Sequence, residues 1–177
     1  MVTDNEATRR LFFALWPGDA ERRQLADAAR RWSRYPVPET NLHITLAFLG
    51  QCSEVQRQCY SDAVSGIPME SFDLQLDYLG AWERRGILWL GSSRIPPSLL
   101  ALVKELNAAL ARCGFEPDKK PFVPHVTLSR KEKKPHPKSV SEVIHWPVRE
   151  LFLMESVTVA GRVQYTALQR WPMQQPV

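Results

Sequence analysis

The sequence predicts an α+β fold with two pseudo-symmetric lobes of antiparallel strands, outer helices and a central groove that carries two His-x-Thr motifs. The first observation is a repeat: His43-Ile44-Thr45-Leu46 and His125-Val126-Thr127-Leu128 share the order His, β-branched residue, Thr, Leu. The second is spacing, since positions 43 and 125 of 177 lie about half a chain apart. The third is a similar order of expected elements in the two halves. Together they indicate an internal duplication with helices outside the strands.

The first half reads as strand, helix, motif strand, helix, strand and strand. The apolar run 10–16 is followed by Pro17-Gly18 and predicts a strand and a turn. Asp19 is expected to cap a helix that reaches about Tyr35, before a Pro-rich break.

The remaining elements of this half follow the first motif. Ser53 is expected to begin a second helix. Residues 72–79 alternate apolar and polar side chains, as a half-buried strand does, and 86–91 form a short apolar strand. The candidate packing residues of the helix are Val55, Tyr60 and Val64.

The second half reads as helix, motif strand, short helix, strand and strand. Residues 98–113 have helical periodicity, and Gly114 supplies a stop. Residues 150–171 predict two strands that turn near Ala160-Gly161-Arg162. The apolar stripe of the helix consists of Leu99, Leu102, Val103, Leu106 and Leu110.

Length and composition fit one domain of two intimate lobes over residues 1–177, with residues 1–9 as a disordered leader. Apolar residues make up 44% and charged residues 24%, as in ordinary globular proteins. The net charge of +4 is compatible with a phosphate-bearing partner. No stretch approaches the roughly twenty apolar residues of a membrane span, and the polar N-terminus is unlike a signal peptide. We therefore expect no membrane association.

The cysteines predict neither a disulfide framework nor a zinc site. Cys52, Cys59 and Cys113 are odd in number and lack CxxC spacing. This usage favours a reducing compartment, so we expect the protein to be cytoplasmic.

Each motif places an imidazole and a hydroxyl on one surface. Side chains alternate between the two faces of a strand, so His43 and Thr45 share a face, as do His125 and Thr127. Two such surfaces facing each other would form a symmetric polar cleft. The alternative is a sheet protein with two accidental matches, which the repetition disfavours.

The chain resembles the 2H phosphoesterase superfamily and, within it, the bacterial RNA 2′,3′-cyclic phosphodiesterases, also called 2′-5′ RNA ligases. The resemblance spans about residues 10–172 and rests on the opening Arg-Leu-Phe-Phe-Ala-Leu and the two motif blocks. These blocks are Asn-Leu-His-Ile-Thr-Leu-Ala-Phe-Leu-Gly and Pro-Phe-Val-Pro-His-Val-Thr-Leu-Ser-Arg. The resemblance implies a groove between two lobes, no metal and no cofactor. Its implied partner is RNA or a nucleotide with a 2′,3′-cyclic phosphate end. We expect the protein to be a monomer.

The implied reaction is hydrolysis of the cyclic phosphate to a 2′-phosphate by two-histidine acid–base catalysis. By analogy with the family, His125 is the base that activates water and His43 is the acid that protonates the 3′ oxygen. Neutral and protonated imidazoles can fill both roles near neutral pH. The hydroxyls of Thr45 and Thr127 can donate hydrogen bonds to the phosphate oxygens.

Two further residues are candidates for substrate binding. Arg130 matches a family arginine that grips the phosphate, although the alternation of a regular strand would aim it at the opposite face unless the chain bends at Ser129. Phe12 is expected to face the groove and stack on a base, with core packing as the alternative. Phe48 alternates with Ile44 and is expected in the core.

Other functions remain open. The same groups could join RNA ends as a 2′-5′ ligase, hydrolyse a small cyclic nucleotide, or bind RNA ends without catalysis. Two titratable histidines disfavour the last, because binding a phosphate does not require them. The basic run 131–138, His136 and His145 are expected to lie in water.

Overall fold

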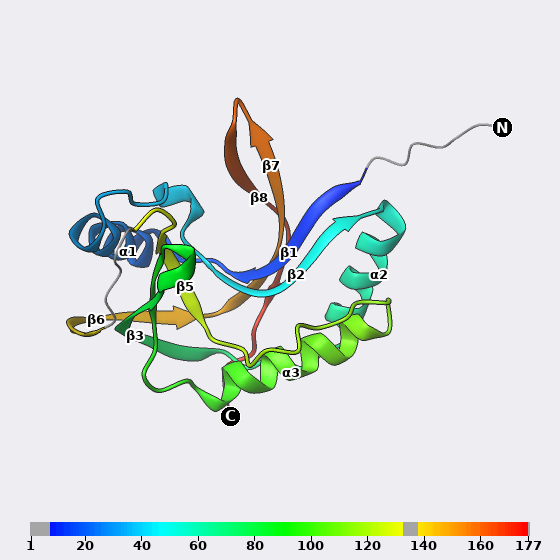
Figure 1. The fold of residues 1–177 in the computed structure, drawn as a ribbon. Coiled ribbons are helices and arrows are strands. Elements are labelled where there is room, and N and C mark those ends of the chain that lie inside the picture. Colours follow the sequence, from blue (N-terminus) through cyan, green and yellow to red (C-terminus); the bar gives the residue numbers. More distant parts are fainter. Residues whose placement is uncertain (1–7, 133–137, 177) are drawn as a thin grey trace.

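The computed structural model describes residues 8–132 and 138–176, and shows two four-stranded antiparallel sheets with helices packed against them (Figure 1). One sheet has the strand order β2-β1-β7-β8 and the other β5-β4-β3-β6. The strands are β1 (Arg9–Leu15), β2 (Ile44–Cys52), β3 (Phe72–Trp82), β4 (Ile87–Gly91), β5 (His125–Ser129), β6 (Lys138–Val148), β7 (Glu150–Val159) and β8 (Arg162–Pro172). The α-helices are α1 (Asp19–Trp32), α2 (Glu54–Ser65) and α3 (Pro97–Ala111), and short 3₁₀ turns occupy Glu39–Asn41 and Glu83–Arg85. The predicted α+β class is confirmed.

The two sheets have corresponding layouts. Each motif strand lies at a sheet edge, β2 in one sheet and β5 in the other, and these edge strands contact each other. Helix α1 packs on β5 and β6, whereas α3 packs on β2 and on α2. Helix α1 of the first half therefore lies against the motif strand of the second half, and α3 of the second half lies against β2, on which α2 also packs (Figure 1).

The hydrophobic core joins both sheets and the inner faces of the helices. Ile44 and Leu46 of β2 and Val126 and Leu128 of β5 are buried in it, as the alternation predicts. Burying a side chain of this size contributes about 1.5–3 kcal/mol. The helix stripe expected on α3 is also buried in this core.

The helix ends agree with the sequence in part. Ser53 caps α2 through a capping box with Gln56, as expected. Asp19 is not the cap of α1, because Gly18 occupies that position and α1 begins with Asp19. Helix α1 also ends at Trp32 rather than Tyr35. There the Ser33 hydroxyl accepts a hydrogen bond from the Tyr35 N–H and donates one to Glu132, so the chain turns away from the helix.

The fold tests three other expectations. On α2, Tyr60 and Val64 pack in the core, but Val55 is 71% exposed because its position points away from the sheet. The strand β6 pairs with β3 over the stretch where the short helix was expected, apart from residues 133–137, which lie outside the described residues together with 1–7 and 177. The last two strands turn at Ala160 and Gly161, whose positive φ angles suit a tight hairpin.

The cysteine prediction was wrong. Cys59 of α2 and Cys113, just after α3, form a disulfide, and Cys52 is a buried free cysteine. The two partners are 54 positions apart in the sequence and meet because α2 packs on α3. Spacing rules detect local pairs, so they give no indication of a bridge that tertiary packing creates.

Candidate active site

The same local bond orients both motif histidines. In each, Nδ1 lies 2.7 Å from the carbonyl oxygen two residues earlier, Asn41 for His43 and Val123 for His125. A carbonyl oxygen only accepts, so Nδ1 carries the proton in both rings, and Nε2 of the neutral ring holds a lone pair. Nε2 of His43 lies 3.0 Å from the Thr45 hydroxyl. Both imidazoles therefore present Nε2 for proton transfer.

A β-bulge follows each motif and resolves the position of Arg130. Thr45 pairs with Ala14 and Ala47 with Phe13, so Leu46 is an extra residue in β2. In β5, Thr127 pairs with Trp89 and Ser129 with Leu88, which makes Leu128 the corresponding extra residue. An extra residue reverses the alternation beyond it.

A regular strand would point the residues beyond each bulge away from the face that carries His and Thr. Because of the reversal, they lie on that face, which we call the motif face. Arg130 follows buried Ser129 and is exposed, and alternation continued beyond the bulge would put it on the side of Thr127. Phe48, expected in the core, is 51% exposed beside Thr45. The expectation for Phe48 was wrong because the bulge at Leu46 shifts it by one position.

A groove of about 1020 Å³ is lined by residues of both motif strands. Thr45 and Phe48 line it from β2, and His125 lines it from β5. The aromatic side chains of Trp82, Phe115 and Phe122 also border it. Its charged lining residues are Glu83, Arg84, Arg85, Glu116, Asp118 and Lys120. Residues far apart in the chain thus meet around one open site.

Aromatic rings enclose the imidazole of His43. Trp16 stacks on it at 5.6 Å between ring centroids, and Tyr165 and Phe12 approach at 5.0 Å and 5.1 Å. Phe12 is on the side of His43 as predicted, but it is only 2% exposed. A base therefore has no free face of Phe12 on which to stack, and the ring packs against His43 and Tyr165 instead.

A second aromatic group surrounds His125. The ring of Trp82 meets it edge-on at 4.6 Å, and Trp89 lies at 6.0 Å. Gly80 makes room for the Trp89 ring, since a Cβ at Gly80 would lie 2.1 Å from it. The sequence did not predict any of the rings Trp16, Tyr165, Trp82 and Trp89 as neighbours of the motif histidines. These rings come from segments that only the pairing of distant strands brings to the motifs.

The pKa of each motif histidine lies below its ordinary value. Burial lowers the pKa of His43 to about 4, helped by the charges of Arg130 and His125, while the bond to Asn41 acts in the opposite direction. Burial also lowers the pKa of His125, again helped by Arg130 and opposed by the bond to Val123. The guanidinium of Arg130 is therefore close enough to act on both imidazoles. A bound anion would offset this charge and raise both pKa values.

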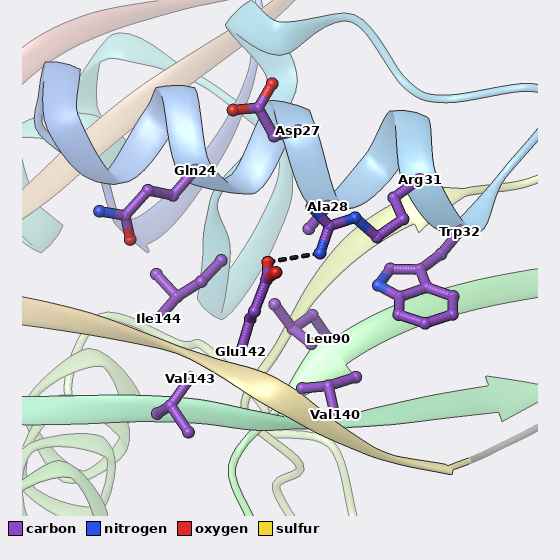
Figure 2. Close-up of a pocket in the computed structure, with 10 residues that line it drawn as sticks. All are labelled: Gln24, Asp27, Ala28, Arg31, Trp32, Leu90, Val140, Glu142, Val143 and Ile144. Atoms are coloured by element: carbon purple, nitrogen blue, oxygen red, sulfur yellow. Dashed lines mark hydrogen bonds and ion pairs between the residues drawn. The ribbon is translucent and has the colours of Figure 1, made fainter.

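The other histidines and a smaller cavity lie apart from this site. His145 is exposed on β6, and His136 lies outside the described residues. A cavity of about 310 Å³ separates α1 from β6, where Arg31 forms an ion pair with Glu142 (Figure 2). Its lining contains none of the predicted site residues, so it is not the motif groove.

Within residues 8–132 and 138–176, no group of three or more His, Cys, Asp or Glu side chains is arranged to hold a metal ion. The helices of this part of the chain include none with the length and apolar character required to cross a bilayer.

Comparison with known proteins identifies the family. The sequence model of the 2′-5′ RNA ligase superfamily matches residues 16–160. The RNA 2′,3′-cyclic phosphodiesterase of Escherichia coli is 36% identical over 149 residues, which cover 79% of this chain and 80% of that protein. The enzyme of the same name from Thermus thermophilus is 30% identical over 184 residues, covering 93% of this chain and 90% of that protein.

Solved structures agree with the sequence match. The crystal structure of E. coli LigT complexed with 3′-AMP superposes with a TM-score of 0.86 at 32% identity, covering 96% of this chain and 100% of that one. LigT in its apo form gives 0.87 at 33% identity, with coverage of 95% and 99%. The chain belongs to the 2′-5′ RNA ligase superfamily, and the resemblance to the RNA cyclic phosphodiesterases is confirmed.

Proposed function

We propose that the protein hydrolyses the 2′,3′-cyclic phosphate of an RNA end or nucleotide to a 2′-phosphate, using His43 and His125 as acid–base catalysts. The observation that carries this proposal is the pair of imidazoles that present the same nitrogen from two facing edge strands. The names of the E. coli and T. thermophilus relatives support the substrate class.

The chemistry follows from two proton transfers. Nε2 of neutral His125 takes a proton from water as the water oxygen bonds to phosphorus. The bond from phosphorus to the 3′ oxygen breaks, and protonated His43 gives its Nε2 proton to that oxygen. The 2′-phosphate remains on the ribose. After the reaction His125 is protonated and His43 is neutral. Proton exchange with solvent restores the starting protonation state of both residues.

The neighbouring groups stabilise the phosphate. The Thr45 and Thr127 hydroxyls donate hydrogen bonds to its non-bridging oxygens, and Arg130 supplies a guanidinium. These donors matter most in the transition state, where negative charge accumulates on the oxygens. The bound phosphate also raises the pKa of His43, so that the acid is protonated when substrate is present.

The reverse reaction is the second candidate. Microscopic reversibility allows the same groups to join a cyclic phosphate or 2′-phosphate end to a 5′-hydroxyl, and the name of the superfamily favours testing it. A reaction with a labelled 5′-hydroxyl oligonucleotide in excess measures the ratio of ligation to hydrolysis.

A metal-free assay tests the main proposal. An oligoribonucleotide with a 2′,3′-cyclic phosphate end is incubated in EDTA with wild type, His43→Ala, His125→Ala and His145→Ala, the last being the exposed-histidine control. We expect a 2′-phosphate product, a loss of at least about 100-fold for each motif variant and normal activity for the control. Turnover that survives both motif substitutions in folded protein would refute the proposal.

We also propose that the enzyme acts as a cytoplasmic monomer. Its size and the aromatic groove within one chain support this, whereas the Cys59–Cys113 disulfide is more typical of oxidising compartments. Light scattering at micromolar concentration tests the oligomeric state. Fractionation of the source cells, with thiol trapping at lysis, tests the compartment and whether the two cysteines are bonded there.

A further inference from the structure

The two halves of the site restrain the carbonyl groups behind their histidines in different ways. His43 donates from Nδ1 to the carbonyl oxygen of Asn41, and His125 donates to that of Val123, at 2.7 Å in each case. The buried Pro124 restricts Val123 to extended backbone and so sets the direction of its carbonyl. The first half has leucine rather than proline at the equivalent position. The direction of the Asn41 carbonyl therefore needs another restraint.

The side chain of Asn41 supplies this restraint. Its Nδ2 donates a hydrogen bond of 3.1 Å to the carbonyl oxygen of Val163 on β8. Because a carbonyl oxygen only accepts, the amide must present its nitrogen there, and Oδ1 accepts from the Thr40 hydroxyl at 3.5 Å. The Asn41 N–H donates to the carbonyl oxygen of Pro38 at 2.8 Å. Asn41 is thus held through its own N–H and its side chain, and its carbonyl is left for His43.

The bond to Val163 joins parts of the sheet that strand pairing does not connect. Strand β2, which follows Asn41 in the chain, and β8 are the opposite edges of their sheet. Three strand spacings, about 14 Å, separate such edges in a flat sheet. The 3₁₀ turn Glu39–Asn41 nevertheless contacts β8. Two residues beyond Val163, Tyr165 meets the His43 ring edge-on, with the centroids 5.0 Å apart. Strand β8 therefore restrains His43 directly through Tyr165 and indirectly through Asn41.

We infer that Asn41 is a positioning residue, whose side chain is anchored on β8 and aims the carbonyl that keeps the proton of His43 on Nδ1. This inference rests on the proposed function, in which His43 is the acid. An imidazole without its Nδ1 acceptor can rotate about its side-chain bonds, and the neutral ring can carry its proton on Nε2 instead. Either change removes the alignment of Nε2 that proton transfer requires. His125 is independent of Asn41, because Pro124 restrains its carbonyl partner.

The isosteric change Asn41→Asp tests this role. A carboxylate has nearly the shape of the amide but cannot donate to a carbonyl oxygen. Asn41→Ala removes the side chain altogether, so it separates the lost bond from the effect of a new charge. Glu39→Gln is the control, because it changes an exposed charge in the same turn.

Two independent readouts are compared for these variants. The first is kcat and KM for a 2′,3′-cyclic nucleotide. The second is NMR of the ring nitrogens in the free protein at about pH 8, where both motif imidazoles are neutral and each nitrogen shows whether it carries the proton.

The inference predicts a change confined to one histidine. We expect both Asn41 variants to lower kcat by about 10- to 100-fold and to change KM by less than about twofold, because a misaligned acid slows the chemical step. The His43 ring should show a mixture of tautomers, while His125 keeps its wild-type signals and Glu39→Gln matches wild type throughout. An unchanged kcat, wild-type tautomer signals at His43, or an equal change at His125 would overturn the inference. If wild type turns over no cyclic phosphate, the proposed function fails, and the NMR comparison still decides whether Asn41 fixes the His43 ring.

Discussion

Leu46 and Leu128 occupy the same place in their strands, each being the extra residue of a bulge that directly follows a His-x-Thr motif. Both side chains remain buried, so the bulges leave the core intact while they reverse the alternation beyond them. The repetition of so specific an irregularity indicates that the two halves of the site share one backbone design. It also accounts for the exposed position of Arg130, directly after buried Ser129.

Replacement of Arg130 should lower activity and raise the pKa of both motif histidines. We expect Arg130→Ala to reduce kcat/KM by about 100- to 1000-fold, because a charge-assisted donor to the phosphate is lost. Arg130→Lys should recover only part of this, since an ammonium lacks the guanidinium fork. NMR titration of the free enzyme should show the imidazole pKa values moving upward, because a nearby cation has been removed. Arg23→Ala, at an exposed position of α1, is the control.

The pH profile of kcat/KM should have its maximum below pH 6.5. This profile reports the free-enzyme pKa values of the acid and the base, and both histidines lie below the ordinary value of 6.5. The maximum falls between the two pKa values whichever histidine is the acid. Measurement with a 2′,3′-cyclic nucleotide from about pH 4 to about pH 9 tests this. A maximum above about pH 7.5 would contradict the lowered pKa values.

Removal of the motif hydroxyls should slow catalysis without unfolding the protein. Thr45→Val and Thr127→Val keep the side-chain shape but cannot donate, so each should reduce kcat by about 10- to 100-fold. Thr45→Ser and Thr127→Ser should restore most of the rate. If valine and serine variants lose equal activity, the methyl group rather than the hydroxyl is what matters at that position.

The free energy of unfolding should fall on acidification because of His43. Its pKa is about 4 in the folded state and 6.5 in the unfolded state, so the unfolded chain binds more protons between these values. The stability contributed by this group is complete above pH 6.5 and decreases as the pH falls toward 4. The loss from this group is about 3 kcal/mol. Urea unfolding at about pH 7 and about pH 4 should show that His43→Asn loses less stability than wild type, whereas His145→Asn behaves as wild type.

Loss of the Cys59–Cys113 disulfide should destabilise the protein only under oxidising conditions. The bridge closes a loop of 54 residues, for which the chain-entropy estimate is about 4 kcal/mol. Cys59→Ser should therefore unfold at lower urea concentration than wild type in the absence of reductant. Adding dithiothreitol should remove the difference. Thiol titration in denaturant should find one free cysteine, Cys52, in the oxidised wild type.

Short-range sequence patterns predicted which face of each strand carries the motif side chains. Pairing between distant strands determined the exposure of the surrounding aromatic residues and the place of β6. The faces of His43 and His125 follow from the alternation of a strand, which the local sequence carries. The exposure of Phe48 depends on a bulge that forms against β1, and the burial of Phe12 depends on Tyr165, which comes from the end of the chain. The strand β6 forms where a short helix was expected because β3 offers it an edge to pair with.

The exchange of helices between the lobes has a consequence for how the site forms during folding. Helix α1 packs on β5 and α3 packs on β2, while α2 adds contacts to β2 from its own half. Each motif strand therefore depends in part on a helix from the other half of the chain. Strand β7 of the second half also completes the sheet of β1 and β2. Contacts between residues so far apart in sequence form late and slowly, so the two histidines are brought together only when both lobes have associated.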